Sequence, residues 1–369
     1  MESDLERIAV ASDLKVMCVV KRWEHHTPSG GYEKLADAVG AEVVYRTTNR
    51  TLSHRIANRL WREFSSPKPY LLDYRYEDSL AEQYVIKMSR ARPLDVVHLL
   101  NGDEQLDLLL RKRERLLSSL VATFHLSPDR VRDRFENVQK HLLSGIDLAV
   151  VVAKSQLQDF AHWLGPDRVV FIPHGINTER FCPGEPGPQH EGLRLLSVGH
   201  HMRDWKAIDR IIAETRCRRL AVRFDIVAPQ DERSGLAQRD NVHFHQGISE
   251  EQLIRLYRES DALLMPVIDA TATNAALEAL ACGTPVISNL VGGMPDYIDG
   301  TCGWLFEKGE VNGIVQLIND ISDRPEIASP LRRGARSKAL GFSWNSIAEK
   351  MRMVYAAAAR RRSPQPLAM

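Results

Sequence analysis

The chain has 369 residues, of which 44% are hydrophobic and 26% charged, and its 49 basic and 48 acidic side chains leave a net charge of +1. This composition is typical of a folded globular protein, and the length allows two domains of ordinary size. The balanced charge argues against a nucleic acid partner. The five cysteines are odd in number and form no C-x-x-C pair, which favours reduced thiols over a disulfide framework or a zinc site.

Hydropathy along the chain bears on the expected location. Residues 1–10 lack the basic start of a secretory signal, and no stretch reaches the roughly 18 apolar residues that a membrane span needs. We therefore expect a cytoplasmic protein that can sit peripherally at the inner face of the membrane. The segment 51–64 is basic and amphipathic and contains Trp61, a pattern that fits either a membrane interface or a helix packed on its own domain.

The first predicted strand covers residues 15–20 and opens into a loop that ends in Gly30 and Gly31, before a helix begins near residue 33. Such a turn brings backbone amides to the end of the strand, although a Gly-Gly pair is also common in ordinary tight turns. His25 and His26 lie on the same loop and are candidates for contact with an acceptor. Nothing at metal-ligand spacing accompanies them.

Further buried strands are predicted at residues 95–100, 120–124 and 147–153. The second of these ends in His125. A histidine at the carboxyl end of a strand is often a polar cleft residue without a chemical role. The Pro- and Gly-rich run at 182–188 is typical of a linker, and we place the change of domain near residue 173.

The second half opens with a predicted strand at 193–199 that ends in Gly199 and is followed by His200, Arg203 and Lys206. Positive charge at this place suits a diphosphate, because guanidinium and ammonium groups bind phosphate oxygens. Two more strands are predicted at 223–228 and 242–247, the latter followed by Ile248.

Residues 262–288 are predicted to form a strand, a loop, a helix at 274–281 and a second strand, which is an α/β unit of a parallel sheet. Either Thr273 or Asn274 would cap the helix, so that the first amides, up to that of Ala275, face the crevice as an anion site. Glu278 follows one turn later among small apolar residues. A buried carboxylate needs hydrogen-bond donors, which a pair of sugar hydroxyls, a nearby Arg or a backbone amide would supply.

Three motifs in this half are similar to one known family. The run E-A-L-A-C-G-T-P-V at 278–286, G-G-M-P-D at 292–296 and G-W-L-F at 303–306 resemble the donor-binding half of the retaining glycosyltransferase family 4. The segment V-V-F-I-P-H-G at 169–175 resembles that family's crossover between domains, with His174 in place of the usual Asn.

The resemblance implies an α/β fold of GT-B architecture, in which two Rossmann-like domains with parallel sheets face a central cleft. The acceptor-side domain would cover residues 1–172, with a helix at 346–360 that crosses back onto it. The nucleotide-sugar domain would cover 173–345. A flexible basic and Pro-rich tail would occupy 361–369.

The resemblance also assigns roles to residues. Lys206 and Arg203 would contact the donor diphosphate, and Glu278 would hold the ribose hydroxyls. His125 and Asp269 would position the sugar, which makes these two and Lys206 the catalytic candidates. The other donor-binding candidates are Gly30, Gly31, Gly199, His200, Ile248, Thr273, Asn274 and Ala275.

Two departures from the family pattern leave alternatives open. His200 stands where the family has an Arg, and Ala270 stands where the family has an acid eight positions before Glu278, although Asp269 is adjacent. The implied activity is retaining transfer from a nucleotide-diphosphate sugar to a polysaccharide, lipid-linked or small-molecule acceptor. An inactive nucleotide-sugar-binding scaffold and a GT-B epimerase are the rivals. No cofactor or catalytic metal is expected, because the chain contains no D-x-D motif.

Overall fold

The computed structural model describes residues 13–21, 29–46, 52–64, 74–135, 143–185, 191–230, 236 and 239–362. The chain divides into two compact units, which are described separately. The first consists of Met1–His26, Gly31–His174 and Trp344–Met369, and the second of Thr27–Gly30 and Gly175–Ser343. The acceptor candidates His25 and His26 lie outside the described residues.

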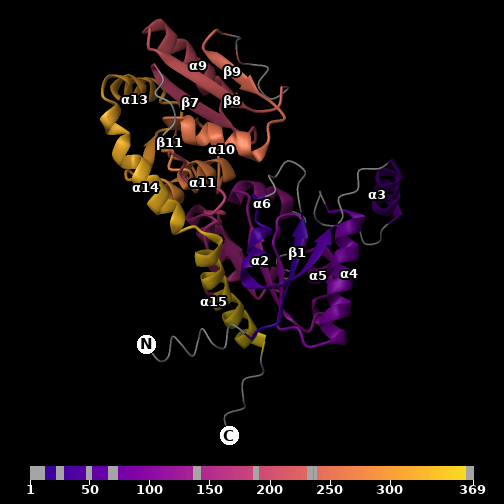
Figure 1. Cartoon of the computed structure of the whole chain (residues 1–369). Coiled ribbons are helices and arrows are strands. Elements are labelled where there is room, and N and C mark those ends of the chain that lie inside the picture. The colour runs from indigo at the N-terminus through magenta and orange to yellow at the C-terminus, as the bar shows by residue number, and fades with distance from the viewer. Residues whose placement is uncertain are drawn as a thin grey trace, which may run out of the picture. The chain divides into compact units, whose positions relative to one another are not determined.

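The first unit is built on a parallel sheet with the strand order β2-β1-β3-β4-β5-β6 (Figure 1). Its central strands are buried along their whole length, in keeping with the continuous apolar runs that the sequence shows there. The strands are β1 (Val16–Lys21), β2 (Glu42–Arg46), β3 (Val96–Leu99), β4 (Ser119–Phe124), β5 (Leu148–Val151) and β6 (Val169–Phe171).

Helices flank this sheet, and several of them form an apolar core with it. The core joins strand residues such as Val97 and Ala122 to helix residues such as Val85, Leu109 and Phe160. The helices are α2 (Lys34–Val39), α3 (Leu52–Phe64), α4 (Tyr76–Ala91), α5 (Asp107–Arg111), α6 (Pro128–Phe135), α8 (Leu157–Leu164) and α15 (Trp344–Arg362).

The helix α15 comes from the end of the chain and is attached to the first sheet by polar contacts. The buried His98 of β3 places Nδ1 2.8 Å from Oη of Tyr355 and Nε2 2.8 Å from Oγ1 of Thr123. The Ser119 hydroxyl donates to the carbonyl of Ala358 over 2.9 Å. Burial lowers the pKa of His98 to about 3, so this imidazole is neutral at physiological pH.

The second unit repeats the architecture with the strand order β12-β11-β10-β7-β8-β9, all parallel. From β7 the chain first builds outward through β8 and β9, and it then returns to the other side of β7 with β10. The strands are β7 (Leu193–Val198), β8 (Val222–Val227), β9 (Val242–His245), β10 (Ala262–Met265), β11 (Val286–Asn289) and β12 (Gly303–Phe306).

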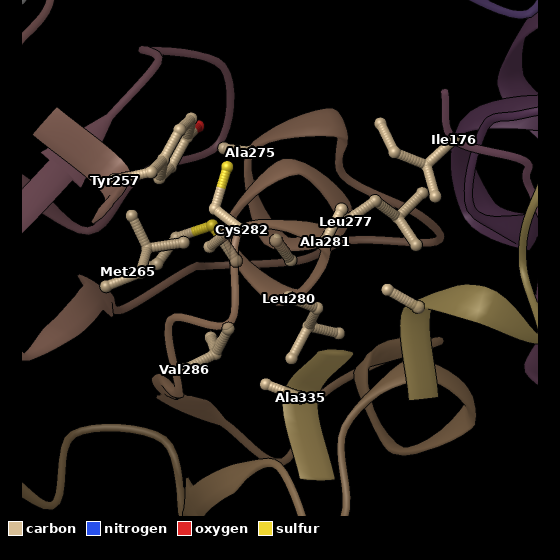
Figure 2. Packing of buried hydrophobic residues seen from close by; sticks show 14 of the residues in the cluster. Ile176, Tyr257, Met265, Ala275, Leu277, Leu280, Ala281, Cys282, Val286 and Ala335 are labelled. Carbon is tan, nitrogen blue, oxygen red and sulfur yellow. The ribbon is translucent and has the colours of Figure 1, made fainter. Parts of the chain in front are cut away.

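Two apolar cores cover the two faces of this sheet. The helices are α9 (Trp205–Cys217), α10 (Glu250–Glu259), α11 (Asn274–Ala281), α12 (Met294–Tyr297), α13 (Val311–Asp323) and α14 (Ser329–Leu340). The small side chains of α11 allow close packing. Figure 2 shows α11 residues such as Leu280 and Ala281 among Met265 of β10, Val286 of β11 and Ala335 of α14. None of the helices in the described ranges combines the length and the hydropathy that crossing a membrane requires.

Candidate functional site

The second unit has a topological switch point between β7 and β10. These strands pair in parallel, with Leu195 opposite Ala262, and the connections that follow them run to opposite sides of the sheet. In open α/β sheets, ligands bind at the carboxyl ends of strands at such a point. Most of the residues that the sequence singled out in this half follow these two strands, at 199–206 and 269–278.

Gly199 directly follows β7 in a backbone conformation that favours glycine. Its φ is +85°, and a Cβ added there would lie 3.0 Å from Nη2 of Arg203. The Arg203 side chain is buried and donates from Nε to the Val198 carbonyl over 3.0 Å and from Nη1 to the His201 carbonyl over 3.1 Å. Burial lowers the pKa of this guanidinium to about 10, which still leaves it positively charged at neutral pH. The loop thus holds a fixed cation beside the end of β7.

Lys206 lies in the first turn of α9 and is exposed. The helix begins there because the Asp204 side chain caps it by accepting from the Ala207 amide over 2.9 Å. Asp209, the acid that follows Lys206 in the sequence pattern, pairs with Arg239 over 2.6 Å. His200 lies half-buried between Gly199 and this helix.

The sequence left open which residue caps α11, and the structure identifies Thr273. Its Oγ1 accepts from the Ala276 amide over 3.2 Å. The amides of Asn274 and Ala275 belong to the first turn and have no partner within the helix, as at the start of every α-helix. The amino end of α11 therefore presents backbone donors and the positive end of the helix dipole next to the switch point.

Glu278 is buried on α11, with 5% of its surface exposed. Its Oε2 accepts a 2.9 Å hydrogen bond from the hydroxyl of Tyr257, a fully buried residue of α10. Burial, followed by the charge of Glu278, raises the pKa of this phenol well above its usual value, so Tyr257 stays a donor. Tyr257 and Ala275 belong to the same buried cluster, which Figure 2 shows. The sequence analysis missed Tyr257, because its place in the apolar face of α10 marks it only as a core residue.

Asp269 lies on the loop after β10 and is half-buried. Its Oδ1 would lie 3.1 Å from a Cβ added to Gly292, whose φ of +52° is in the left-handed region. Within the described ranges this carboxylate has no hydrogen bond or ion pair to another side chain. Ile248 follows β9 and packs partly buried against the core that contains α11.

In the first unit, His125 follows β4 and is held by two contacts. Its backbone amide donates to Oδ2 of Asp103 over 2.6 Å, and its Nε2 lies 2.8 Å from the Leu100 carbonyl. A carbonyl can only accept, so Nε2 carries a proton and Nδ1 is the acceptor in the neutral ring. Burial raises the pKa of Asp103, against the effect of His125 and the two amides it accepts from. The sequence analysis also missed Asp103, which lies in a polar loop after β3 and holds the backbone of His125.

The rings of Tyr32 and His174 lie beside His125 on the same unit, and Trp344 packs against both of them. The centroid of Tyr32 lies 4.7 Å from that of His125 and 5.1 Å from that of His174, and Trp344 lies 5.4 Å from His174. His174, which replaces the family's Asn, is thus part of an aromatic cluster. Gly31 precedes Tyr32 with a φ of +99°.

The glycine pair 30–31 spans the division between the units. Gly31 belongs to the first unit, whereas Gly30 groups with the second, in which the neighbouring Ser29 amide donates to Glu250 over 2.9 Å. In the described part of the chain, no group of three or more His, Cys, Asp or Glu side chains is placed to hold a metal ion.

Comparison with known proteins identifies the family. Residues 33–180 match the model described as glycosyltransferase family 4, and residues 192–324 match the model described as glycosyl transferases group 1, so that together they cover more than half of the chain. The chain belongs to glycosyltransferase family 4. Both halves of this family 4 chain are therefore recognised, including the segment 192–324 that contains the switch point.

Curated relatives and solved structures agree with this assignment. The family 4 chain is 25% identical over 60% of its length to an MMP alpha-(1->4)-mannosyltransferase of Mycolicibacterium hassiacum, and 29% identical over 52% to a D-inositol 3-phosphate glycosyltransferase of Streptomyces scabiei. It spans 56% and 49% of these relatives. The HepE protein of Anabaena in complex with UDP-glucose has the same fold, with a TM-score of 0.66, 14% identity and coverage of 92% of this chain and 98% of that one. The GT-B fold expected from the sequence is confirmed.

Proposed function

We propose that this protein transfers a sugar from a nucleotide-diphosphate donor to an acceptor hydroxyl, with retention of the anomeric configuration. The observation that carries the proposal is the arrangement on α11, where Glu278 is buried one turn behind the open amides at the switch point. A carboxylate can accept from two neighbouring hydroxyls, as a ribose presents, while the amides suit a diphosphate. Membership of family 4 supports the same reading.

The residues that follow β7 would neutralise the leaving group. Lys206 and Arg203 carry the positive charge there, and the amides of Thr273 to Ala275 add donors from the other side of the switch point. Such fixed donors lower the barrier when they face the charge that develops in the transition state. Arg203 is already held by two carbonyls, so little reorganisation is needed when phosphate arrives. We assign to Arg203 the diphosphate contact that the family makes with the Arg at the position of His200.

The proposed transfer has a simple balance of bonds. The bond between the sugar C1 and the β-phosphate oxygen breaks, the acceptor oxygen bonds to C1 on the same face, and the acceptor proton passes to the leaving phosphate. No nucleophilic side chain is needed in this front-face attack. The chain's residues bind and orient the donor, and His125 and Asp269 position its sugar.

Three donor contacts and two acceptor contacts remain as proposals from the resemblance. We assign Gly30 and Gly31 to the loop near the donor phosphates, and the backbone near Ile248 to the nucleobase. His25 and His26 would face the acceptor. No cofactor is part of the proposal, and activity that survives EDTA would support transfer without a metal ion.

A donor screen tests the proposal. We expect one class among UDP, GDP and ADP sugars to raise the melting temperature, because a ligand that binds only the folded state stabilises it. HepE was crystallised with UDP-glucose, and one relative is a mannosyltransferase, so UDP-glucose and GDP-mannose come first. Glu278→Ala and Lys206→Ala should each abolish the shift.

The controls are Glu326→Ala and Lys350→Ala, which remove exposed charges of the same type and should leave the shift intact. If neither site variant changes the shift, the donor does not bind at the switch point. Incubation of the donor with candidate acceptors, followed by NMR of the anomeric proton, then separates the alternatives. Binding without transfer or hydrolysis would indicate a scaffold, and epimerised donor without acceptor would indicate an epimerase.

A further inference from the structure

The helices α3 and α4 expose an unusual amount of apolar surface. Among the described residues, six of the twelve large hydrophobic side chains that stand exposed belong to these two helices. Phe64, at the end of α3, is 78% exposed, more than any of the other eleven. We call this set the α3–α4 face; its members are Ile56, Leu60, Phe64, Tyr76, Leu80 and Tyr84.

The members of the α3–α4 face form one apolar stripe on each helix. Within each helix its three members recur every four residues, so they form one stripe per helix. The half-buried Trp61 of α3 packs between the two helices, with its ring centroid 6.1 Å from that of Tyr76. Asn58 fixes the pairing of the helices, since it accepts from the Tyr76 amide and donates to Glu77, each over 2.8 Å. In Figure 1, α3 lies at the outer side of α4 in the first unit.

The helix α4 buries its acidic side chains together with Ala81, Val85 and Ile86, and it exposes other large apolar ones. Its three carboxylates are buried. Glu77 accepts from the Asn58 side chain, and Asp78 pairs with Arg46 over 2.7 Å. Glu82 accepts from two backbone amides, those of Leu106 over 2.9 Å and Leu109 over 2.7 Å. Surface helices usually turn charged groups outward and apolar groups inward. On α4, tyrosine and leucine face the solvent instead.

The charges that these helices do expose are mostly basic. Arg55 and Arg59 on α3 and Lys87 on α4 are exposed, whereas Glu63 is the one exposed acid on α3 and none is exposed on α4 in the described ranges. An apolar surface bordered by Arg and Lys, with aromatic rings among its members, has the chemistry of a peripheral membrane site. A second copy of the chain would bring like charges together, and a partner protein needs no such excess of positive charge.

We propose that the α3–α4 face docks on an anionic lipid bilayer, with Ile56, Leu60 and Phe64 entering the interface and Arg55 and Arg59 contacting the headgroups. This property goes beyond sugar transfer and holds whatever donor the second unit binds. The docking anchors the first unit through a surface rather than through a membrane-spanning helix. The sequence already indicated a membrane interface for the basic amphipathic segment 51–64, and α4 adds a second exposed apolar stripe.

Vesicle flotation with the full chain tests the proposal. We expect binding to mixed phosphatidylcholine and phosphatidylglycerol vesicles and little binding to phosphatidylcholine alone, with loss at high salt. Leu60→Asp combined with Phe64→Asp should lower binding at least about tenfold, because apolar side chains that would enter the membrane interface become charged. Arg55→Gln and Arg59→Gln should each lower it about fivefold on anionic vesicles. Met353→Asp is the control, since Met353 is 62% exposed on α15 of the same unit.

Two results would overturn the proposal. One is absence of wild-type binding to anionic vesicles at low salt, and the other is an equal loss in the Met353→Asp control. Light scattering after size exclusion adds a further check, because a dimer that Phe64→Asp dissociates would assign the face to self-association. All variants change exposed positions, and an unchanged melting temperature verifies that they fold. The donor-dependent shift is measured separately, so failure of one proposal leaves the other standing.

Discussion

Two regions of the molecule bury a glutamate on a helix, and the two carboxylates differ in what they bind. Glu82 of α4 is fully buried in the first unit, and its two oxygens accept from the amides of Leu106 and Leu109, which begin α5. Glu278 of α11 is buried in the second unit and accepts from the Tyr257 hydroxyl. Glu82 thus completes the start of another helix, whereas Glu278 lies behind a helix start that stays open.

The comparison shows that burial alone does not mark a functional carboxylate. Burial raises the pKa of Glu82 to about 8, although the groups that donate to it are backbone amides at the start of α5. What distinguishes Glu278 is its position one turn from amides that have no partner within their helix and that lie at a switch point. The groups around a buried carboxylate therefore indicate whether it stabilises the fold or is placed to bind a ligand.

Exchanging each glutamate for alanine should give the largest effects and should separate the structural carboxylate from the ligand-binding one. Glu82→Ala leaves two buried amides without acceptors and creates a cavity, so we expect it to lower the unfolding free energy of the first unit by about 3 kcal/mol or more. Glu278→Ala should cost less stability but abolish the donor-dependent rise in melting temperature. Hydrogen exchange of peptides from each unit during urea unfolding measures both effects. Equal destabilisation of the two units would contradict the distinction.

Acidification tests a second difference, because His98 makes the first unit sensitive to pH. Its folded pKa of about 3 lies below the unfolded value of 6.5, so its contribution to stability is present above pH 6.5 and is lost as pH falls toward 3. Relative to His98→Gln, the wild type should lose about 2 kcal/mol between pH 6.5 and 5, at about 1.4 kcal/mol per pH unit. The measurement is urea unfolding of both proteins at each pH.

Glu82 and Asp78 act in the opposite direction, which is why the variant is needed as the reference. Burial raises their pKa values to about 8 and about 6, so their contributions are present at low pH and are lost as pH rises through those values. The wild type alone could therefore look insensitive to acid. A difference between wild type and His98→Gln that stays constant from pH 6.5 to 5 would rule out the role of His98.

Much of the second unit could be predicted from the sequence, because its signals are local. The helix Asn274–Ala281 has the predicted bounds, since a capping threonine precedes it and a Gly-Thr-Pro break follows it. The buried strands of both sheets stood out as apolar runs. Family motifs at 278–306 supplied the GT-B fold, which no periodicity could have given.

The contacts between distant residues could not be predicted. Tyr257 lies 21 positions from Glu278, and Asp103 lies 22 positions from His125, and nothing in the sequence pairs them. The burial of the acidic side chains of α4 was equally hidden, because they find partners on β2 and at the start of α5 through tertiary packing. The roles of the site residues remain predictions until the donor screen is done.

The smallest expected effect concerns the cap of α11. Comparing it with the cap of α10 tells a helix start that binds a ligand from one whose cap only stabilises the helix. Thr273→Val removes Oγ1 at nearly constant volume, which should cost about 1 kcal/mol, and Thr273→Ser should restore it. Ser249→Ala removes the similar cap of α10, where Oγ accepts from the Gln252 amide, at a similar cost. Only Thr273→Val should also reduce the donor-dependent shift, because the amides beside Thr273 would bind the diphosphate. An equal reduction in Ser249→Ala would mean that the shift follows overall stability and that the open end of α11 has no special part in binding.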